Sequence, residues 1–266
     1  MAFPDGPLWL IGCGNMGGAM LRGWLAAGLD PARVTVITRS GRGAPEGVRS
    51  LTALPVDETP ATLMLGFKPQ QIDEVAPGLA GLRPRLLLSI LAGVEVAALG
   101  DRFAADAIVR LMPNLPVAIG QGVTALHTPS DDADVRDAAE AFAAPLGHVE
   151  WVEDEGRFDS VTALAGCGPG FVFRYIDAMA QAGMVLGLDA DQARRLAIAT
   201  VAGASAMAAG ADVSPATLAD RVASPGGSTR QGLNVLDEGD ALVRLMTDTL
   251  AASDRRNREM AAAARR

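Results

Sequence analysis

The sequence predicts an α/β protein with an N-terminal domain built on a doubly wound parallel sheet, residues 1–154, and an all-helical C-terminal domain, residues 155–266. Two observations predict this fold class. Up to Asp154, short apolar runs that suit strands alternate with helical or irregular segments, which is the pattern of a parallel sheet covered by helices. After Asp154 the strand signals stop, and long alanine-rich helical patterns follow.

Five apolar runs in the first half are predicted to be strands, because they are short and rich in β-branched residues or leucine. They are residues 8–12, 33–39, 62–67, 86–93 and 107–113. Residues 122–128 and 148–153 extend the sheet, with a helix over residues 132–147 between them. The second half is predicted to form helices over residues 157–166, 170–187 and 189–210, and on either side of residues 222–233.

The composition limits the classes of partner. A chain of 266 residues is long enough for two domains with their own cores. A net charge of −8 and an aromatic content of 4% argue against a nucleic-acid-binding surface, so the expected partner is a small molecule. Cys13 and Cys167 fit neither a metal spacing nor a disulfide framework, which favours a reducing compartment. Without a leader-like start or a long apolar tract, the chain is expected to be soluble and cytoplasmic, with no membrane partner.

A G-x-G-x-x-G pattern, formed by Gly12, Gly14 and Gly17, follows the first predicted strand and opens a helix. In the dinucleotide-binding Rossmann fold, the first glycine permits a tight turn, the second lets the backbone approach a pyrophosphate, and the third allows close helix–sheet packing. The predicted cofactor-binding residues of this turn are Ile11, Gly12, Cys13, Gly14, Asn15, Met16 and Gly17. The alternative is a packing turn in another kind of α/β protein.

The end of the second predicted strand selects the cofactor. An NAD site has an acidic residue there for the ribose hydroxyls, whereas this chain has Arg39 and Ser40. A guanidinium can pair with a 2′-phosphate and a hydroxyl can donate to it, so NADPH is favoured, with NADH possible. Arg42 is a second candidate for the phosphate. The alternative is a solvated arginine in a loop.

Two further segments follow predicted strands at the sheet edge where ligands bind. They are Gly66, Phe67, Lys68 and Pro69, and Leu91, Ala92 and Gly93. Both are expected to border the nicotinamide. Lys68 is the single lysine in a chain with 22 arginines, which favours a role near the cofactor over the alternative, capping of a local carbonyl.

The stretch "VASPGGSTRQGL", residues 222–233, interrupts the alanine-rich half. Pro225 cannot continue a helix, and Gly226 and Gly227 lower the cost of unusual backbone angles. A new helix is expected to start near Ser228 or Thr229. Amide groups at such a start can bind an anion, although helix–helix connections often have this composition for structural reasons alone.

Five segments come in the order and spacing typical of pyrroline-5-carboxylate reductases, and this resemblance covers nearly the whole chain. The segments are "LIGCGNMGGAM", "FKP", "IVRLMPNLPVAIGQG", "VTALAGCGPGFVFRYIDAMAQAGMVLGL" and "VASPGGSTRQGLNVL". The last is the most specific, because few dehydrogenases share a Ser-Pro-Gly-Gly-x-Thr turn between late helices. The resemblance implies a Rossmann domain, a helical domain that interlocks with a second subunit, a homodimer or higher assembly of dimers, and NADPH-dependent reduction of (S)-1-pyrroline-5-carboxylate to L-proline.

The resemblance also implies a substrate site after residue 222. Its residues are Ser224, Gly226, Gly227, Ser228 and Thr229, whose amides and hydroxyls would hold the substrate carboxylate. Thr229 takes the catalytic position whose hydroxyl contacts the imine nitrogen. Glu155 matches a carboxylate that lines the family's substrate site, with an acidic helix start as the structural alternative. Because an imine that arrives protonated needs no strong acid, His127 and His148 are expected to be structural.

The chain departs from the family's pattern at several places. Only "SGRGAPEG" separates the second strand from "VRSL", where a full helix is usual, and Leu115, Cys167 and Gly170 replace threonine, serine and alanine. A reductase of a related cyclic imine is therefore an alternative. A non-catalytic NADP-sensing protein is a second alternative, which could keep the glycine-rich turn but would have no need for "SPGGST". A hydroxyacid dehydrogenase is nearly excluded, because it would need a lysine or comparable acid/base group in the helical domain and no lysine follows Asp154.

Overall fold

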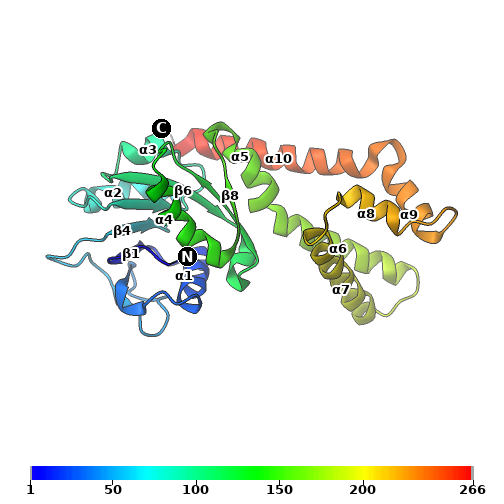
Figure 1. Ribbon diagram of the computed structural model, residues 1–266, viewed down its shortest axis with the longest axis horizontal. Coiled ribbons are helices and arrows are strands. Elements are labelled where there is room, and N and C mark those ends of the chain that lie inside the picture. The colour runs from blue at the N-terminus through cyan, green and yellow to red at the C-terminus, as the bar shows by residue number, and fades with distance from the viewer. Residues whose placement is uncertain (1, 265–266) are drawn as a thin grey trace. The chain divides into compact units, whose positions relative to one another are not determined.

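The computed structural model describes residues 2–264, and the chain divides into two compact units. The first unit consists of the residues up to Cys167 together with those from Ser253 onward, and the second is Gly168–Ala252. All the strands belong to the first unit, and the second is helical throughout its regular elements (Figure 1). The expected order, a sheet-containing half followed by a helical one, is confirmed.

The first unit is built on an eight-stranded sheet with the order β3-β2-β1-β4-β5-β6-β7-β8. Its strands are β1 Leu8–Ile11, β2 Val34–Ile37, β3 Arg49–Leu51, β4 Thr62–Leu65, β5 Leu86–Ser89, β6 Ala107–Pro113, β7 Gly122–His127 and β8 Gly147–Trp151. Neighbouring strands are parallel except β6 and β7, which pair antiparallel with Arg110 opposite His127. The short connection over residues 114–121 explains this exception, because a parallel return would need a longer crossover.

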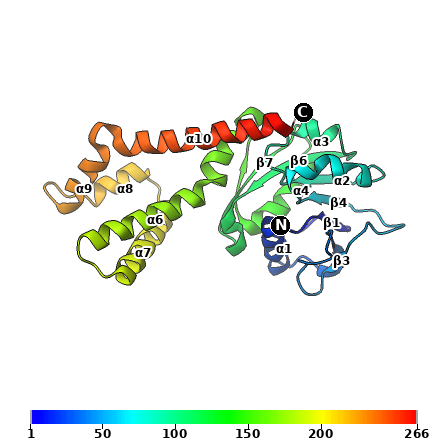
Figure 2. The same cartoon turned by 180° about the vertical axis from the view of Figure 1, so that it is seen from behind.

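Helices cover both faces of the sheet (Figures 1 and 2). On one face, α1 (Asn15–Ala26) and α4 (Ala133–Ala143) bury Trp24 and Phe142 against alternate strand residues such as Leu10. On the other face, α2 (Ile72–Leu79) and α3 (Val96–Gly100) pack on the opposite set, which includes Trp9. Strands buried on both faces must be apolar at successive positions, which explains why they read as continuous apolar runs.

The sheet unit continues beyond Asp154. Phe158, at the start of α5 (Phe158–Val161), is buried in a cluster with Val152. Asn257 of α10 (Ala241–Ala264) donates from Nδ2 to the carbonyl oxygen of Asp159 at 3.1 Å. The compact units therefore differ from the division predicted after Asp154, because residues 155–167 and the end of α10 both pack on the sheet side.

The second unit contains α6 (Gly168–Val185), α7 (Ala190–Ala209), α8 (Pro215–Arg221), α9 (Ser228–Asp237) and the part of α10 up to Ala252. Helices α6 and α7 pack together through a small buried cluster of Ala180, Ala193 and Ala197. Asp189 caps α7 by accepting from the amides of Asp191 and Gln192. Within residues 2–264, none of the helices has the length and apolar content that crossing a membrane requires.

Candidate active site

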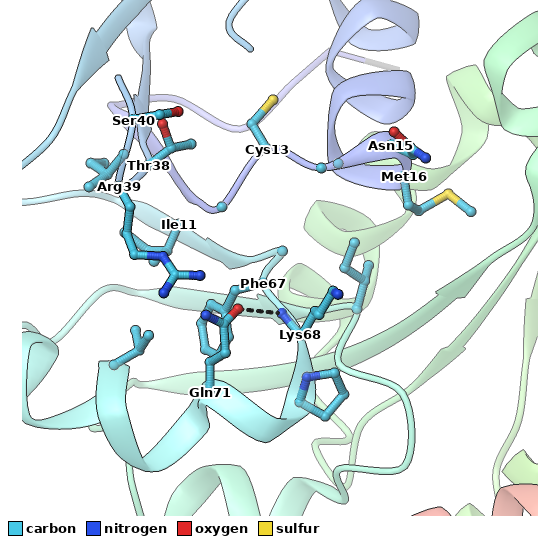
Figure 3. A pocket seen from close by; sticks show the side chains of 18 of the residues that line it. Ile11, Cys13, Asn15, Met16, Thr38, Arg39, Ser40, Phe67, Lys68 and Gln71 are labelled. Atoms are coloured by element: carbon cyan, nitrogen blue, oxygen red, sulfur yellow. Dashed lines mark hydrogen bonds between the residues drawn. The ribbon is translucent and has the colours of Figure 1, made fainter. Parts of the chain in front are cut away.

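A pocket of about 900 Å³ lies in the first unit at the carboxyl ends of β1, β2 and β4 (Figure 3). Three segments supply much of its lining: Ile11–Gly17, the end of β2 through Ser40, and Gly66–Pro69. This edge is where open sheets with helices on both faces bind ligands. The structure thus brings together predicted cofactor-binding residues from three separate parts of the sequence.

The three motif glycines have three different steric surroundings. Gly12 has a φ of +86°, and a Cβ there would lie 2.9 Å from the backbone of Gly66, so the turn requires glycine. A Cβ on Gly14 would meet no heavy atom within 4 Å, which leaves room beside the backbone at the pocket wall. A Cβ on Gly17 would lie 3.4 Å from the Gly12 carbonyl oxygen, which is an ordinary van der Waals contact, so the space at this position does not by itself require glycine. The constrained turn at Gly12 and the open backbone at Gly14 fit a pyrophosphate-binding turn.

Helix α1 begins at Asn15, on the wall of the pocket. Its N-cap residue is Gly14, no side chain caps the helix, and the first turn contains no acidic residue. The amides of the first turn lack intrahelical acceptors and form the positive end of the helix dipole. The pocket therefore offers a backbone site suited to a diphosphate.

The segment after β2 places two arginines, Arg39 and Arg42, on the pocket wall. The Thr38 hydroxyl donates to the carbonyl oxygen of Arg42 at 3.3 Å, and the Arg42 amide donates to Ser40 Oγ at 3.3 Å. These two bonds hold the segment in a compact turn. The predicted 2′-phosphate residues therefore lie on one short, ordered loop at the end of β2.

Cys13 ties this loop to the glycine-rich turn. Its thiol donates to the carbonyl oxygen of Gly43 at 3.4 Å, and Gly43 has a φ of +97°. Burial raises the pKa of the Cys13 thiol, while the Arg22 guanidinium opposes that shift. A raised pKa keeps the thiol protonated and able to donate. The loop that replaces the usual helix between β2 and β3 is thus folded back toward the glycine-rich turn.

Lys68 lies on the pocket wall after β4 (Figure 3). Its backbone amide donates to Gln71 Oε1 at 3.3 Å, which braces the 3₁₀ turn Pro69–Gln71. The Lys68 side chain is exposed. Its predicted role at the cofactor stays a prediction.

The segment after β5 is only partly in the pocket. Ala92 lines it, but Leu91 and Gly93 are not among its lining residues. Leu91 is buried in the core, and a Cβ on Gly93 would lie 3.1 Å from the amide nitrogen of Ala261, so both residues shape the loop that carries Ala92.

Several lining residues are not among the predicted site residues. They are Ile37, Thr38, Thr52, Gln71, Glu74, Val75, Ile90, Met112 and Pro113. Met112 and Pro113 end β6, so their position at the ligand-binding edge was a usable signal. Glu74 and Val75 lie in the first turn of α2, and the sequence pattern carries no comparable signal for them.

Glu155 lies outside this pocket and lines a separate one of about 320 Å³. Its Oε1 accepts from the Arg110 guanidinium at 2.6 Å and from the Val96 amide at 2.9 Å. The Arg110 side chain is 5% exposed, so it is a buried cation that needs this carboxylate. Glu155 therefore joins β6 to the start of α3, and its predicted substrate contact stays a prediction.

The two histidines occupy different surroundings. His127 is buried, and its Nδ1 lies 2.7 Å from the carbonyl oxygen of Val152. His148 is exposed beside Glu150, with a distance of 3.1 Å between Nε2 and Oε2. Neither lines the dinucleotide pocket. Structural roles for both remain the interpretation.

The predicted substrate-binding residues of the second unit lie in the turn between α8 and α9 and at the start of α9. The Gly227 amide donates to the Ser224 carbonyl oxygen at 2.9 Å across Pro225 and Gly226. Gly226 has a φ of +73°, as a turn with proline second and glycine third requires. A Cβ on Gly227 would lie 2.5 Å from Ser224 Oγ and 3.1 Å from the Ser224 carbonyl oxygen, so a side chain there would require Ser224 to shift. The composition of this stretch thus has a backbone reason.

Helix α9 begins at Ser228, with Gly227 as its N-cap residue and no side-chain cap. Ser228 and Thr229 are exposed at its first two positions. Arg230 forms an ion pair of 2.6 Å with Asp220 at the end of α8, which ties the turn at its base. The turn therefore combines open helix-start amides with two exposed hydroxyls, an arrangement that suits a carboxylate.

Two protein families match this chain, one in each half. The family described as "Pyrroline-5-carboxylate reductase dimerisation" matches residues 155–260, and the one described as "NADP oxidoreductase coenzyme F420-dependent" matches residues 8–93. A pyrroline-5-carboxylate reductase of Glycine max is 34% identical, with 95% of each chain covered. One of Pseudomonas aeruginosa is 32% identical, covering 94% of this chain and 95% of its own.

A solved structure shows the same fold. The structure of a pyrroline-5-carboxylate reductase from Coxiella burnetii superposes with a TM-score of 0.82 at 29% identity, covering 96% of this chain and 98% of that one. The residues matched by the two families include both the glycine-rich turn and the turn before α9. The chain belongs to the pyrroline-5-carboxylate reductase family.

Proposed function

We propose that this protein catalyses the NADPH-dependent reduction of (S)-1-pyrroline-5-carboxylate to L-proline. The observation that carries the proposal is the full-length similarity to relatives of that name, in a chain that keeps both a dinucleotide pocket and an anion-binding turn. NADPH would supply the hydride, while the protein supplies position and electrostatics.

The pocket residues have distinct roles in this proposal. The amides at the start of α1, beside Gly14, hold the diphosphate, because the helix dipole and the open backbone both favour it. Arg39, Ser40 and Arg42 hold the 2′-phosphate. Lys68 and the segments after β4 and β5 lie on the nicotinamide side. The end of β2 carries Arg39 and Ser40 in place of the acidic residue of an NAD site, which supports NADPH, with NADH as a slower substitute.

The turn before α9 holds the substrate. The amides of Ser228 and Thr229, with the Ser224 hydroxyl, bind the carboxylate at the positive end of the α9 dipole. The Gly227 amide, which donates to the Ser224 carbonyl oxygen, holds the turn in shape. The Thr229 hydroxyl orients the imine nitrogen. If the imine is protonated before it binds, hydride addition to its carbon gives the amine directly, and no protein acid is consumed.

The protein acts as a homodimer or a multiple of one. Apolar side chains of the helical unit are widely exposed in a single chain, including Val185 at 87% and Leu186 at 85%. The buried cluster of this unit is formed by three alanines, so these larger side chains need another surface. A second copy is the proposed cover, and the free thiols of Cys13 and Cys167 favour a cytoplasmic location.

The test is turnover of synthetic pyrroline-5-carboxylate by the purified protein, followed as NADPH oxidation and as proline formed. The expected result is equal amounts of NADPH consumed and proline released. A six-membered cyclic imine carboxylate tests the related-imine alternative: preference for it would replace the proposed substrate. Binding of NADPH with neither imine reduced would favour a sensing protein.

A further inference from the structure

Glu74 faces the predicted 2′-phosphate site from across the pocket. Its Oε1 lies 3.9 Å from the Arg39 guanidinium, and both residues line the pocket. Arg39 comes from the end of β2, whereas Glu74 comes from the first turn of α2. Figure 3 shows the Arg39 guanidinium extending toward Gln71, at the α2 side of the pocket.

The charges on the pocket wall are unevenly distributed. The cationic lining residues are Arg39, Arg42 and Lys68, and Glu74 is the acidic one among the lining residues that the structure describes. Arg39 and Glu74 have side chains 80% and 65% exposed, so both can move to accommodate a ligand. A ligand phosphate at Arg39 would therefore compete with the Glu74 carboxylate and be repelled by it.

We propose that Glu74 is a specificity-determining residue that limits the preference of this enzyme for NADPH over NADH. The inference rests on the proposed function, because it assumes that the pocket binds these two cofactors. NADPH carries its additional phosphate next to Arg39, so it loses affinity to the competing carboxylate. NADH has a neutral hydroxyl at that position and does not. The chain thus carries one residue that favours NADPH, Arg39, opposite one that disfavours it, Glu74.

Glu74 also has a local role from which the specificity effect must be separated. It lies with Asp73 in the first turn of α2, where an acidic side chain interacts favourably with the helix dipole. Asp73 pairs with Arg102 at 2.9 Å and does not line the pocket. Asp73→Asn therefore removes the same charge from the same helix turn without altering the pocket, and it is the matched control for Glu74→Gln.

The experiment measures dissociation constants of NADPH and NADH for the wild type, Glu74→Gln and Asp73→Asn by fluorescence titration. For Glu74→Gln, we expect NADPH to bind about 3–10-fold more tightly, as removal of one repelling, partly screened charge predicts. NADH affinity should stay within about twofold, and Asp73→Asn should leave both within about twofold. The gain for NADPH should shrink between about 0.05 M and about 0.5 M salt, because exposed charges are screened.

The same titrations with adenosine 2′,5′-bisphosphate and with 5′-AMP test the effect of Glu74 on the 2′-phosphate without any turnover. Only the bisphosphate should gain affinity in Glu74→Gln. Equal gains for both nucleotides, no gain for either, or the same gain in Asp73→Asn would overturn the inference. A wild type that binds neither NADPH nor NADH would instead refute the proposed function.

Discussion

Replacing Gly14 by alanine should separate cofactor binding from folding. The Gly14 backbone has φ −76° and ψ −165°, which alanine adopts without strain, and a Cβ there would meet no heavy atom within 4 Å. Alanine is a poorer N-cap than glycine but restricts the unfolded chain, so the two effects should offset to within about 1 kcal/mol. The folded enzyme should therefore be nearly as stable as the wild type.

The same methyl group would project at the pocket wall, where the diphosphate must approach the backbone. Loss of one charge-assisted hydrogen bond costs about 1.5–3 kcal/mol, so NADPH affinity should fall by about 10–100-fold. Fluorescence titration measures the affinity, and thermal unfolding measures the stability.

Gly18→Ala provides the control one turn along α1. A Cβ there would lie 3.4 Å from an Arg22 nitrogen and 3.6 Å from the Cys13 sulfur, and Gly18 does not line the pocket. It should leave NADPH affinity within about twofold and stabilise the helix by about 0.5–1 kcal/mol. Wild-type NADPH affinity in Gly14→Ala, or a stability loss above about 2 kcal/mol, would refute the assignment of this turn.

Four further outcomes are expected. Arg39→Asp should reduce or reverse the preference for NADPH in kcat/KM by removing a contact worth about 1.5–3 kcal/mol; a wild type that already favours NADH would contradict this. Thr229→Ala should lower catalytic efficiency by about 10–10³-fold with NADPH binding unchanged, and Thr229→Ser should retain much more; equal impairment of both variants would assign the role to the methyl group or backbone. Light scattering should show a dimer or a multiple of one, and an active monomer at micromolar concentration would refute the proposed interface. Burial raises the pKa of Asp159, so the ionised carboxylate lowers folding stability above that raised pKa. Asp159→Asn should therefore raise Tm at neutral pH. This increase in Tm should vanish below about pH 4, where Asp159 is protonated in both the folded and the unfolded state.

The sequence by itself determined the features that depend on local backbone chemistry. Short apolar runs, separated by helical or irregular segments, identified the sheet half, because a strand buried on both faces must be apolar at successive residues. The positive φ of Gly12 and Gly226 made glycine necessary at two turns, which is why both turns are readable as motifs. Arg39 could be placed at the pocket because the end of β2 has a known position in such folds.

Only the tertiary structure decided which distant side chains meet. Glu155 pairs with Arg110, 45 residues away, and the periodicity of neither segment encodes that contact. The end of α10 returns to the sheet unit, where Ala261 packs against Gly93. Glu74 looks like any acidic residue in a first helical turn until the fold places it opposite Arg39. Local patterns are set by backbone geometry and burial, whereas these pairings depend on how whole elements dock.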